Sequence, residues 1–191
     1  QTIFSSGDMG RGRDSFEAAI GAKSAYQGTL TYREDLWFHA VSKLYLNSEN
    51  RIDQLIAGLE DIVERFPEDT EARAFLALEL WIFRYVVAEE QDQDLRAKID
   101  RLVESVISEN PMHPAHHYKI HLWNDGIEDF HALESARLLG PAQEQTAHLW
   151  HMPAHIFTAH GDIFYAWRHT EIAHRVDHEQ MRLRHLMPAN Q

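Results

Sequence analysis

Apolar residues recur every three or four positions along most of this chain, from Tyr32 onward. One apolar stripe runs through residues 33–47 and another through 51–66, with the i, i+3, i+4 spacing of an amphipathic helix. Asn50 precedes the second stripe as a candidate N-cap, and Pro67 follows it as a helix breaker. The pattern therefore predicts a pair of helices here, with a short connection between them.

Three more helix pairs follow from the same periodicity. Asp69 or Thr70 is the candidate cap of the next helix, and the polar run 89–94 is predicted to be a loop. Short connections imply antiparallel neighbours. We therefore predict an all-α fold of about four antiparallel hairpins, in which 33–47 pairs with 51–66, 70–88 with 94–109, 114–124 with 127–139, and 145–160 with 162–180.

The first 31 residues carry a weaker pattern. Gly7, Gly10 and Gly12 predict an irregular or partly helical arm, with a short helix over residues 14–25. We expect two parts, an arm over 1–31 and a helical repeat domain over 32–191. The chain begins with Gln1 rather than Met, so we expect it to be part of a longer protein.

Two histidine pairs stand out in the helical region. His117 and His121 form the first pair, and His151 and His155, each 34 residues later, form the second. Spacing of i, i+4 places both rings of a pair on one helix face. A period of 34 is that of a helix–turn–helix repeat, so equivalent helices of adjacent repeats are expected to bring the four rings together.

Four convergent imidazoles would suit a transition metal ion, with Zn or Cu favoured and Fe or Ni compatible. His113 and His148 each lie one turn from a pair and are weaker candidates for an outer ligand. Carboxylates that could orient the rings are Asp125, Asp162 and Glu171. The alternative is that the rings are simply packed or solvated, because the chain has 14 histidines.

The fourth predicted hairpin resembles the tetratricopeptide repeat (TPR). It carries large, small and aromatic residues at the spacing of that repeat, namely Trp150, Ala154, Phe157, Gly161, Asp162, Ala166 and Ala173. The segments His113–His121 and His151–Ile156 also resemble the HPxxHxxxH and HMPxHI segments of a group of bacterial TPR-like proteins. The resemblance implies a superhelix whose concave groove holds a protein or peptide partner, or a small molecule.

Net charge and composition limit the classes of function that the chain can have. The 191 residues carry a formal net charge of −12, which disfavours nucleic-acid binding. No apolar stretch is long enough to predict insertion into a membrane. The chain has no cysteine, which excludes thiolate ligands and leaves cytoplasm and periplasm both open. Two hypotheses remain: a binding or scaffold module with a metal in its histidine-lined groove, or a metal-dependent enzyme of hydrolase or oxygenase type.

Overall fold

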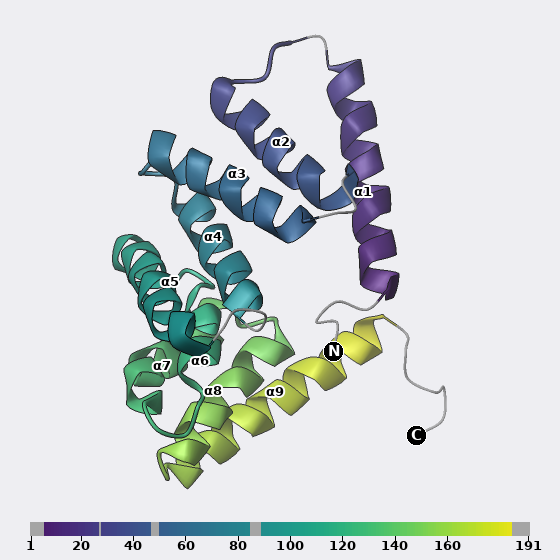
Figure 1. Ribbon diagram of the computed structural model, residues 1–191. Helices are drawn as coiled ribbons and strands as arrows, with labels where there is room; N and C mark the ends of the chain where they lie inside the picture. Colours follow the sequence, from purple (N-terminus) through teal and green to yellow (C-terminus); the bar gives the residue numbers. More distant parts are fainter. Residues whose placement is uncertain (1–5, 27, 47–49, 85–88, 185–191) are drawn as a thin grey trace. The chain divides into compact units, whose positions relative to one another are not determined.

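The computed structural model describes residues 6–26, 28–46, 50–84 and 89–184. These residues form nine α-helices and one 3₁₀ helix and include no strand (Figure 1). The structure is 82% helical, which confirms the all-α prediction. In chain order the elements are α1 (Ser6–Ala25), α2 (Tyr32–Leu46), α3 (Arg51–Arg65), α4 (Thr70–Phe83), α5 (Glu89–Glu109), α6 (His116–Trp123), η2 (Asp129–Ala132), α7 (Leu133–Ala142), α8 (Ala147–Ala159) and α9 (Ile163–Leu183).

The chain divides into two compact units, residues 1–95 (unit 1) and 96–191 (unit 2), and the division falls within α5. The domain boundary predicted near residue 32 is a different one and stays a prediction. In unit 1, α2 packs on α3 and α3 on α4. A Cβ on Gly58 would lie 2.8 Å from that of Ala40, so the missing side chain lets α2 and α3 approach closely.

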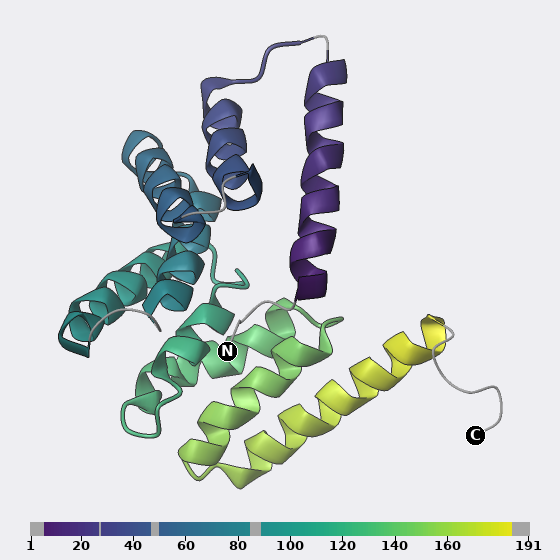
Figure 2. The ribbon, with the colours of Figure 1, turned by 45° about the vertical axis from the view of Figure 1, so that its right-hand side comes forward.

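Helix α1 begins earlier than its glycines suggest. It runs beside α2 (Figures 1 and 2). Phe16 is buried against the rings of Phe38 and Tyr45 of α2. A Cβ on Gly12 would lie 2.5 Å from the hydroxyl oxygen of Tyr45, so this glycine makes room for the tyrosine. Packing against α2 thus offsets the cost of glycine in a helix, about 1 kcal/mol per residue.

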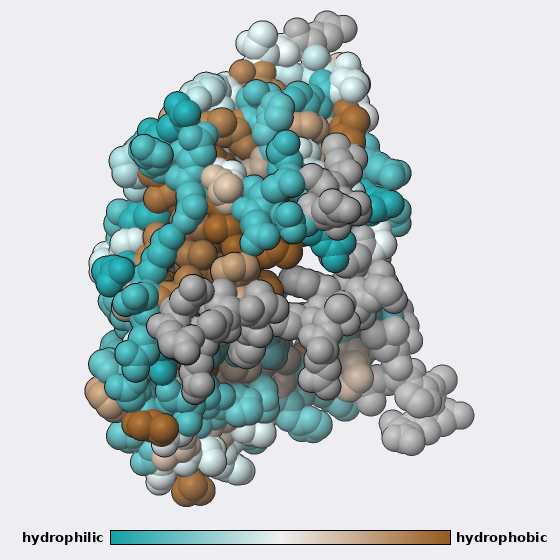
Figure 3. Space-filling view, viewed as in Figure 1, coloured by the Kyte–Doolittle hydropathy of each residue, from teal (hydrophilic) through white to brown (hydrophobic). Residues whose placement is uncertain are grey.

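Helices α1, α2 and α4 line an apolar groove of about 900 Å³ in unit 1, with Phe16, Trp37 and Phe75 in its walls. Figure 3 shows apolar residues that reach the surface of this face among hydrophilic ones. The rim carries charges of both signs, including Lys23 and Glu71. Unit 1 therefore presents an open, mainly apolar recess.

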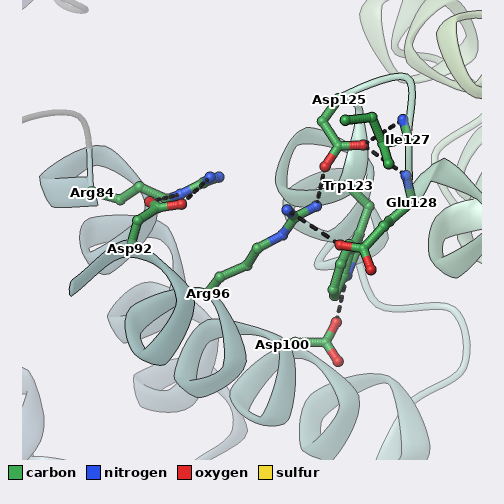
Figure 4. A network of polar contacts seen from close by, with 8 residues as sticks. All are labelled: Arg84, Asp92, Arg96, Asp100, Trp123, Asp125, Ile127 and Glu128. Carbon is green, nitrogen blue, oxygen red and sulfur yellow. Dashed lines mark hydrogen bonds and ion pairs between the residues drawn. The ribbon is translucent and has the colours of Figure 1, made fainter. Parts of the chain in front are cut away.

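Two local predictions in unit 1 need correction. Residues 89–94 are not a loop but the first turns of α5, because Glu, Gln and Asp are tolerated in a helix and Asp92 forms an ion pair with Arg84 (Figure 4). Asn50 precedes α3 in a left-handed conformation, and its side chain makes no capping hydrogen bond. Asp69, in contrast, caps α4 as predicted by accepting a hydrogen bond from the backbone of Ala72.

Unit 2 contains α6 to α9 and the C-terminal part of α5. Its core joins α6, η2, α7, α8 and α9 through Ile120, Ala132, Ala136, Leu139, Met152, Ala154, Ile156, Phe157 and Ala166. Gly161 has φ +78° in the turn between α8 and α9, and Asp162 caps α9 through the backbone of Tyr165. Four of the seven repeat-like positions of the fourth hairpin are buried, namely Ala154, Phe157, Ala166 and Ala173.

A polar network fixes α6 and the loop after it against α5 (Figure 4). The indole Nε1 of Trp123 donates to Asp100 at 2.7 Å, and the Arg96 guanidinium lies 4.0 Å from the Trp123 ring centroid. Arg96 also pairs with Asp125, whose carboxylate accepts backbone hydrogen bonds from Ile127 and Glu128. This network holds α6 at a defined position in unit 2.

Candidate metal centre

The candidate site is built on α6 and α8, which contact each other in unit 2. The turn before α6 is held by His113, whose Nδ1 accepts a hydrogen bond from the backbone of Ala115 at 3.0 Å. Pro153 lies inside α8, so the helix lacks one backbone hydrogen bond there. His113, a weaker ligand candidate, is buried and helps to hold the start of α6.

Three imidazoles converge between these helices. Nε2 of His117 lies 3.0 Å from Nε2 of His121 and 3.1 Å from Nε2 of His148. In the part of the chain that the structure describes, one group of three or more potential ligands has all its ligand atoms within 4.8 Å of one another, and it consists of these histidines. We call it the His triad.

Hydrogen bonds alone do not account for this arrangement. A neutral imidazole nitrogen carries either one proton or one lone pair, directed along a single line. Nε2 of His117 faces two other Nε2 atoms at once, so it cannot make a good N–H···N bond with both. Two nitrogens bound at 2.0–2.1 Å to a tetrahedral ion lie roughly 3.3 Å apart, which is close to the two separations measured from His117.

The second predicted pair forms a separate contact. Nε2 of His155 lies 3.0 Å from Nε2 of His151, one turn apart on the exposed face of α8. The rings of His148 and His151 have centroids 6.4 Å apart, so this pair lies next to the triad. The structure thus brings His117 and His121 together with His148, and His151 with His155. A single ion held by the four predicted histidines stays a prediction.

His148 was a weaker candidate in the sequence, because the 34-residue period pointed to His151. His148, which contacts His117, lies three residues before the position that the period gives. Three residues are nearly one helical turn. The i, i+3 spacing of His148 and His151 shows that both can lie on the same side of α8. That spacing is the sequence signal that pointed to His148.

Burial keeps the triad rings neutral. Desolvation, followed by the charges of His121 and His148, lowers the pKa of His117 to about 3. Desolvation and the neighbouring rings of His148 and His155 lower the pKa of His121 to about 4. The pKa of His148 is also lowered, by desolvation and then by His151. Neutral imidazole is the form that binds a metal, so the site is prepared for ligation at neutral pH.

His116 has a different role from its neighbour His117. It is 2% exposed, its Nε2 lies 2.9 Å from the carbonyl of Pro111, and its Nδ1 lies 2.9 Å from Oγ of Ser135. A carbonyl only accepts, so Nε2 donates and Nδ1 accepts from the serine hydroxyl. His116 therefore ties α6 to α7 and to the preceding turn, and burial lowers its pKa.

The carboxylates expected to orient the rings have other partners. Asp125 pairs with Arg96, Asp162 caps α9, and Glu171 pairs with Arg175. Burial would raise the pKa of Asp125, but its hydrogen bonds to Glu128, Ile127 and Arg96 lower it to about 2. These acids therefore serve helix ends and ion pairs in unit 2.

The remaining histidines of the last helix do not join the triad. His169 is buried between the rings of Trp150 and Phe157, whereas His174 and His178 are exposed. His185 lies outside the described residues. The outer face of α9 is therefore solvated at His174 and His178, whereas His169 is packed against α8.

Comparisons with known proteins bear on the fold. No protein-family profile matches the chain, and no curated protein matches it. The solved structure of MamA (MSR-1, C2) matches with a TM-score of 0.58 and 12% sequence identity, over 89% of this chain and 94% of that one. None of the described helices is both long and apolar enough to cross a bilayer. MamA is a TPR-like helical protein, and the likeness shows that this chain has a TPR-like helical repeat fold.

Proposed function

We propose that this chain is a TPR-like binding module that holds a transition metal ion on His117, His121 and His148. The observation that carries the proposal is the convergence of three Nε2 atoms within 4.8 Å of one another. Two of these rings come from α6 and one from α8, so a bound ion would cross-link neighbouring hairpins. Their lowered pKa values keep them available as neutral ligands.

The donor set favours Zn or Cu, with Fe and Ni compatible. Imidazole nitrogen suits all four metals, and the absence of cysteine excludes a thiolate-based site. The net charge of −12 attracts cations to the molecule as a whole. The role of the metal in this proposal is to fix α6 to α8 and to present its remaining coordination positions to a partner.

The partner we propose is a protein or peptide segment. This rests on the fold, because helical repeat proteins use their extended surfaces for recognition, and it is therefore an analogy at the level of the fold. The apolar groove of unit 1 adds a local argument, since an open recess lined by Phe16, Trp37 and Phe75 suits an apolar side chain. A small molecule in the groove is the other occupant that this fold permits.

The metal proposal is tested by Zn²⁺ binding to metal-free protein, measured by competition with a chromophoric chelator. We expect tight binding by the wild type and its loss in His117→Ala. The control is His160→Ala, because His160 is exposed at the C-terminal end of α8 and outside the triad. Equal Zn²⁺ affinity in wild type and His117→Ala would contradict the proposal.

A metal-dependent enzyme is the second candidate, and one observation favours it. The triad offers three protein ligands, and His148 is exposed, so a bound ion would keep a position open to solvent. Catalytic zinc sites commonly have three protein ligands and one water. In Co²⁺-loaded protein, azide should change the visible spectrum if such a position exists. An unchanged spectrum would exclude this candidate.

A further inference from the structure

The His151–His155 pair is a feature that the triad does not use. Its two Nε2 atoms lie 3.0 Å apart on α8, and both side chains are exposed. They do not belong to the group whose ligand atoms all lie within 4.8 Å of one another. One ion cannot contact all five rings in this arrangement, so the histidines divide into a triad and a pair.

We propose that His151 and His155 form a second transition-metal site beside the triad, a bis-imidazole site with open coordination positions. An i, i+4 pair of histidines on one helix face is a common way for a helix to present two nitrogens to a single ion. The separation of 3.0 Å is close to that of two ligands of one ion.

The surroundings of the pair leave room for further ligands. His151 and His148 line a groove of about 320 Å³ between α8 and α9, together with Thr170, His174 and Asp177. The pair therefore borders both the triad, through His148, and an open recess. An ion on the pair would complete its coordination with water or with donor groups of a bound molecule, such as an imidazole or a carboxylate.

The two sites should differ in strength and geometry. The triad supplies three half-buried or exposed rings from two helices, whereas the pair supplies two exposed rings from one. Fewer protein ligands and greater exposure make the second site the weaker one and leave it more water ligands. A Co²⁺ ion on the triad is expected to be tetrahedral with intense visible bands, and one on the pair to be six-coordinate with weak bands.

The test is a Co²⁺ titration of metal-free wild-type protein, followed by calorimetry and by visible absorption. We expect two binding events, a tight one with intense bands and a weaker one with weak bands. His155→Ala and His151→Ala should each lose the weak event and keep the tight one. His117→Ala should lose the tight event and keep the weak one, and His160→Ala should keep both.

The outcomes separate this inference from the proposed function. A single event in the wild type that disappears in both His117→Ala and His155→Ala would overturn the second site and indicate one shared ion. A single event that survives in His155→Ala and His151→Ala would overturn it and leave the triad intact. Loss of the weak event in His155→Ala and His151→Ala, with the tight event unchanged, supports the second site. If the triad binds no metal, loss of the weak event in these two variants still supports it. Circular dichroism of each variant checks that the helices are retained.

Discussion

Nε2 of His148 lies 3.1 Å from Nε2 of His117, although the two residues are 31 positions apart in the chain. The repeat period of 34 residues would instead place His151 opposite His117. The first turn of α8 thus lies beside His117, and His148 becomes the third member of the triad. The exposed side of the site is formed by this residue.

The first prediction compares these two residues of α8. His148→Ala should lower the Zn²⁺ affinity of the tight site by more than the roughly 10–100-fold that removal of an outer-shell partner costs. His151→Ala should leave that affinity nearly unchanged, because its ring contacts His155. Chelator competition on both variants measures the difference. A larger loss in His151→Ala would show that the repeat period, and not the observed contact, sets the ligands.

The second prediction concerns acid stability of the metal-free protein. The folded-state pKa values of His117 and His121, about 3 and about 4, lie below the ordinary value of 6.5. The unfolded chain therefore takes up protons first as the pH falls, and the free energy of unfolding decreases between about pH 6.5 and pH 4. Stability from these rings is present above pH 6.5 and lost towards their folded pKa values.

Melting temperatures between pH 7.5 and pH 4.5, in the presence of a chelator, check this. A variant with both His117→Ala and His121→Ala should lose less stability across that range than the wild type. Parallel curves for the two proteins would mean that the rings are not desolvated in the folded state.

The third prediction concerns Glu79 of α4, which is 8% exposed and whose Oε2 has no hydrogen-bond partner among the described residues. Burial raises its pKa to about 7. Its contribution to stability is present below the ordinary value of 4.5 and lost as the pH rises through 7. Glu79→Gln should therefore stabilise the protein at pH 8, by at most about 3 kcal/mol, and change little at pH 4.5.

Denaturant unfolding of wild type and Glu79→Gln at both pH values measures this effect. Equal destabilisation of the variant at pH 8 and pH 4.5 would contradict the prediction. It would mean that the carboxyl group makes a stabilising polar contact beyond those described.

The fourth prediction concerns Gly140 near the end of α7. A Cβ at this position would lie well inside the van der Waals distance of the Trp150 ring. Overpacking of this kind costs about 1–3 kcal/mol, more than the roughly 1 kcal/mol that Ala gains over Gly in a helix. Gly140→Ala should therefore lower the melting temperature. Gly21→Ala is the matched control, since nothing lies within 4 Å of its Cβ position, and it should not destabilise α1.

The sequence was sufficient for the fold where side-chain periodicity decides the outcome. The stripe Leu55, Ile56, Leu59 and Ile62 is the buried face of α3. Three of the predicted hairpins are formed by helices that pack on each other, α2 with α3, α6 with α7, and α8 with α9, whereas the pairing of 70–88 with 94–109 stays a prediction. It was insufficient for residues 89–94, where a polar composition without an apolar stripe gives no periodicity, although the segment is helical.

The site was predicted in part for a related reason. The i, i+4 spacing correctly placed His117 beside His121 and His151 beside His155, because helix geometry is local. The offset between α6 and α8 depends on packing between helices, in a core that includes Ile120 of α6 and Ile156 of α8, and the histidine spacing does not encode it. Spacing selected His117, which has a histidine four residues later, but gave no sign that its neighbour His116 is buried and holds α6 to α7.

Anomalous diffraction would show at atomic resolution whether His117, His121 and His148 bind one metal ion. Crystals of the protein grown with Zn²⁺ would be measured on both sides of the zinc absorption edge. We expect an anomalous peak at about 2.0–2.1 Å from the three Nε2 atoms. A zinc-containing crystal without a peak at these rings, or with its tightly bound zinc on other histidines, would show that the His triad is not the metal site.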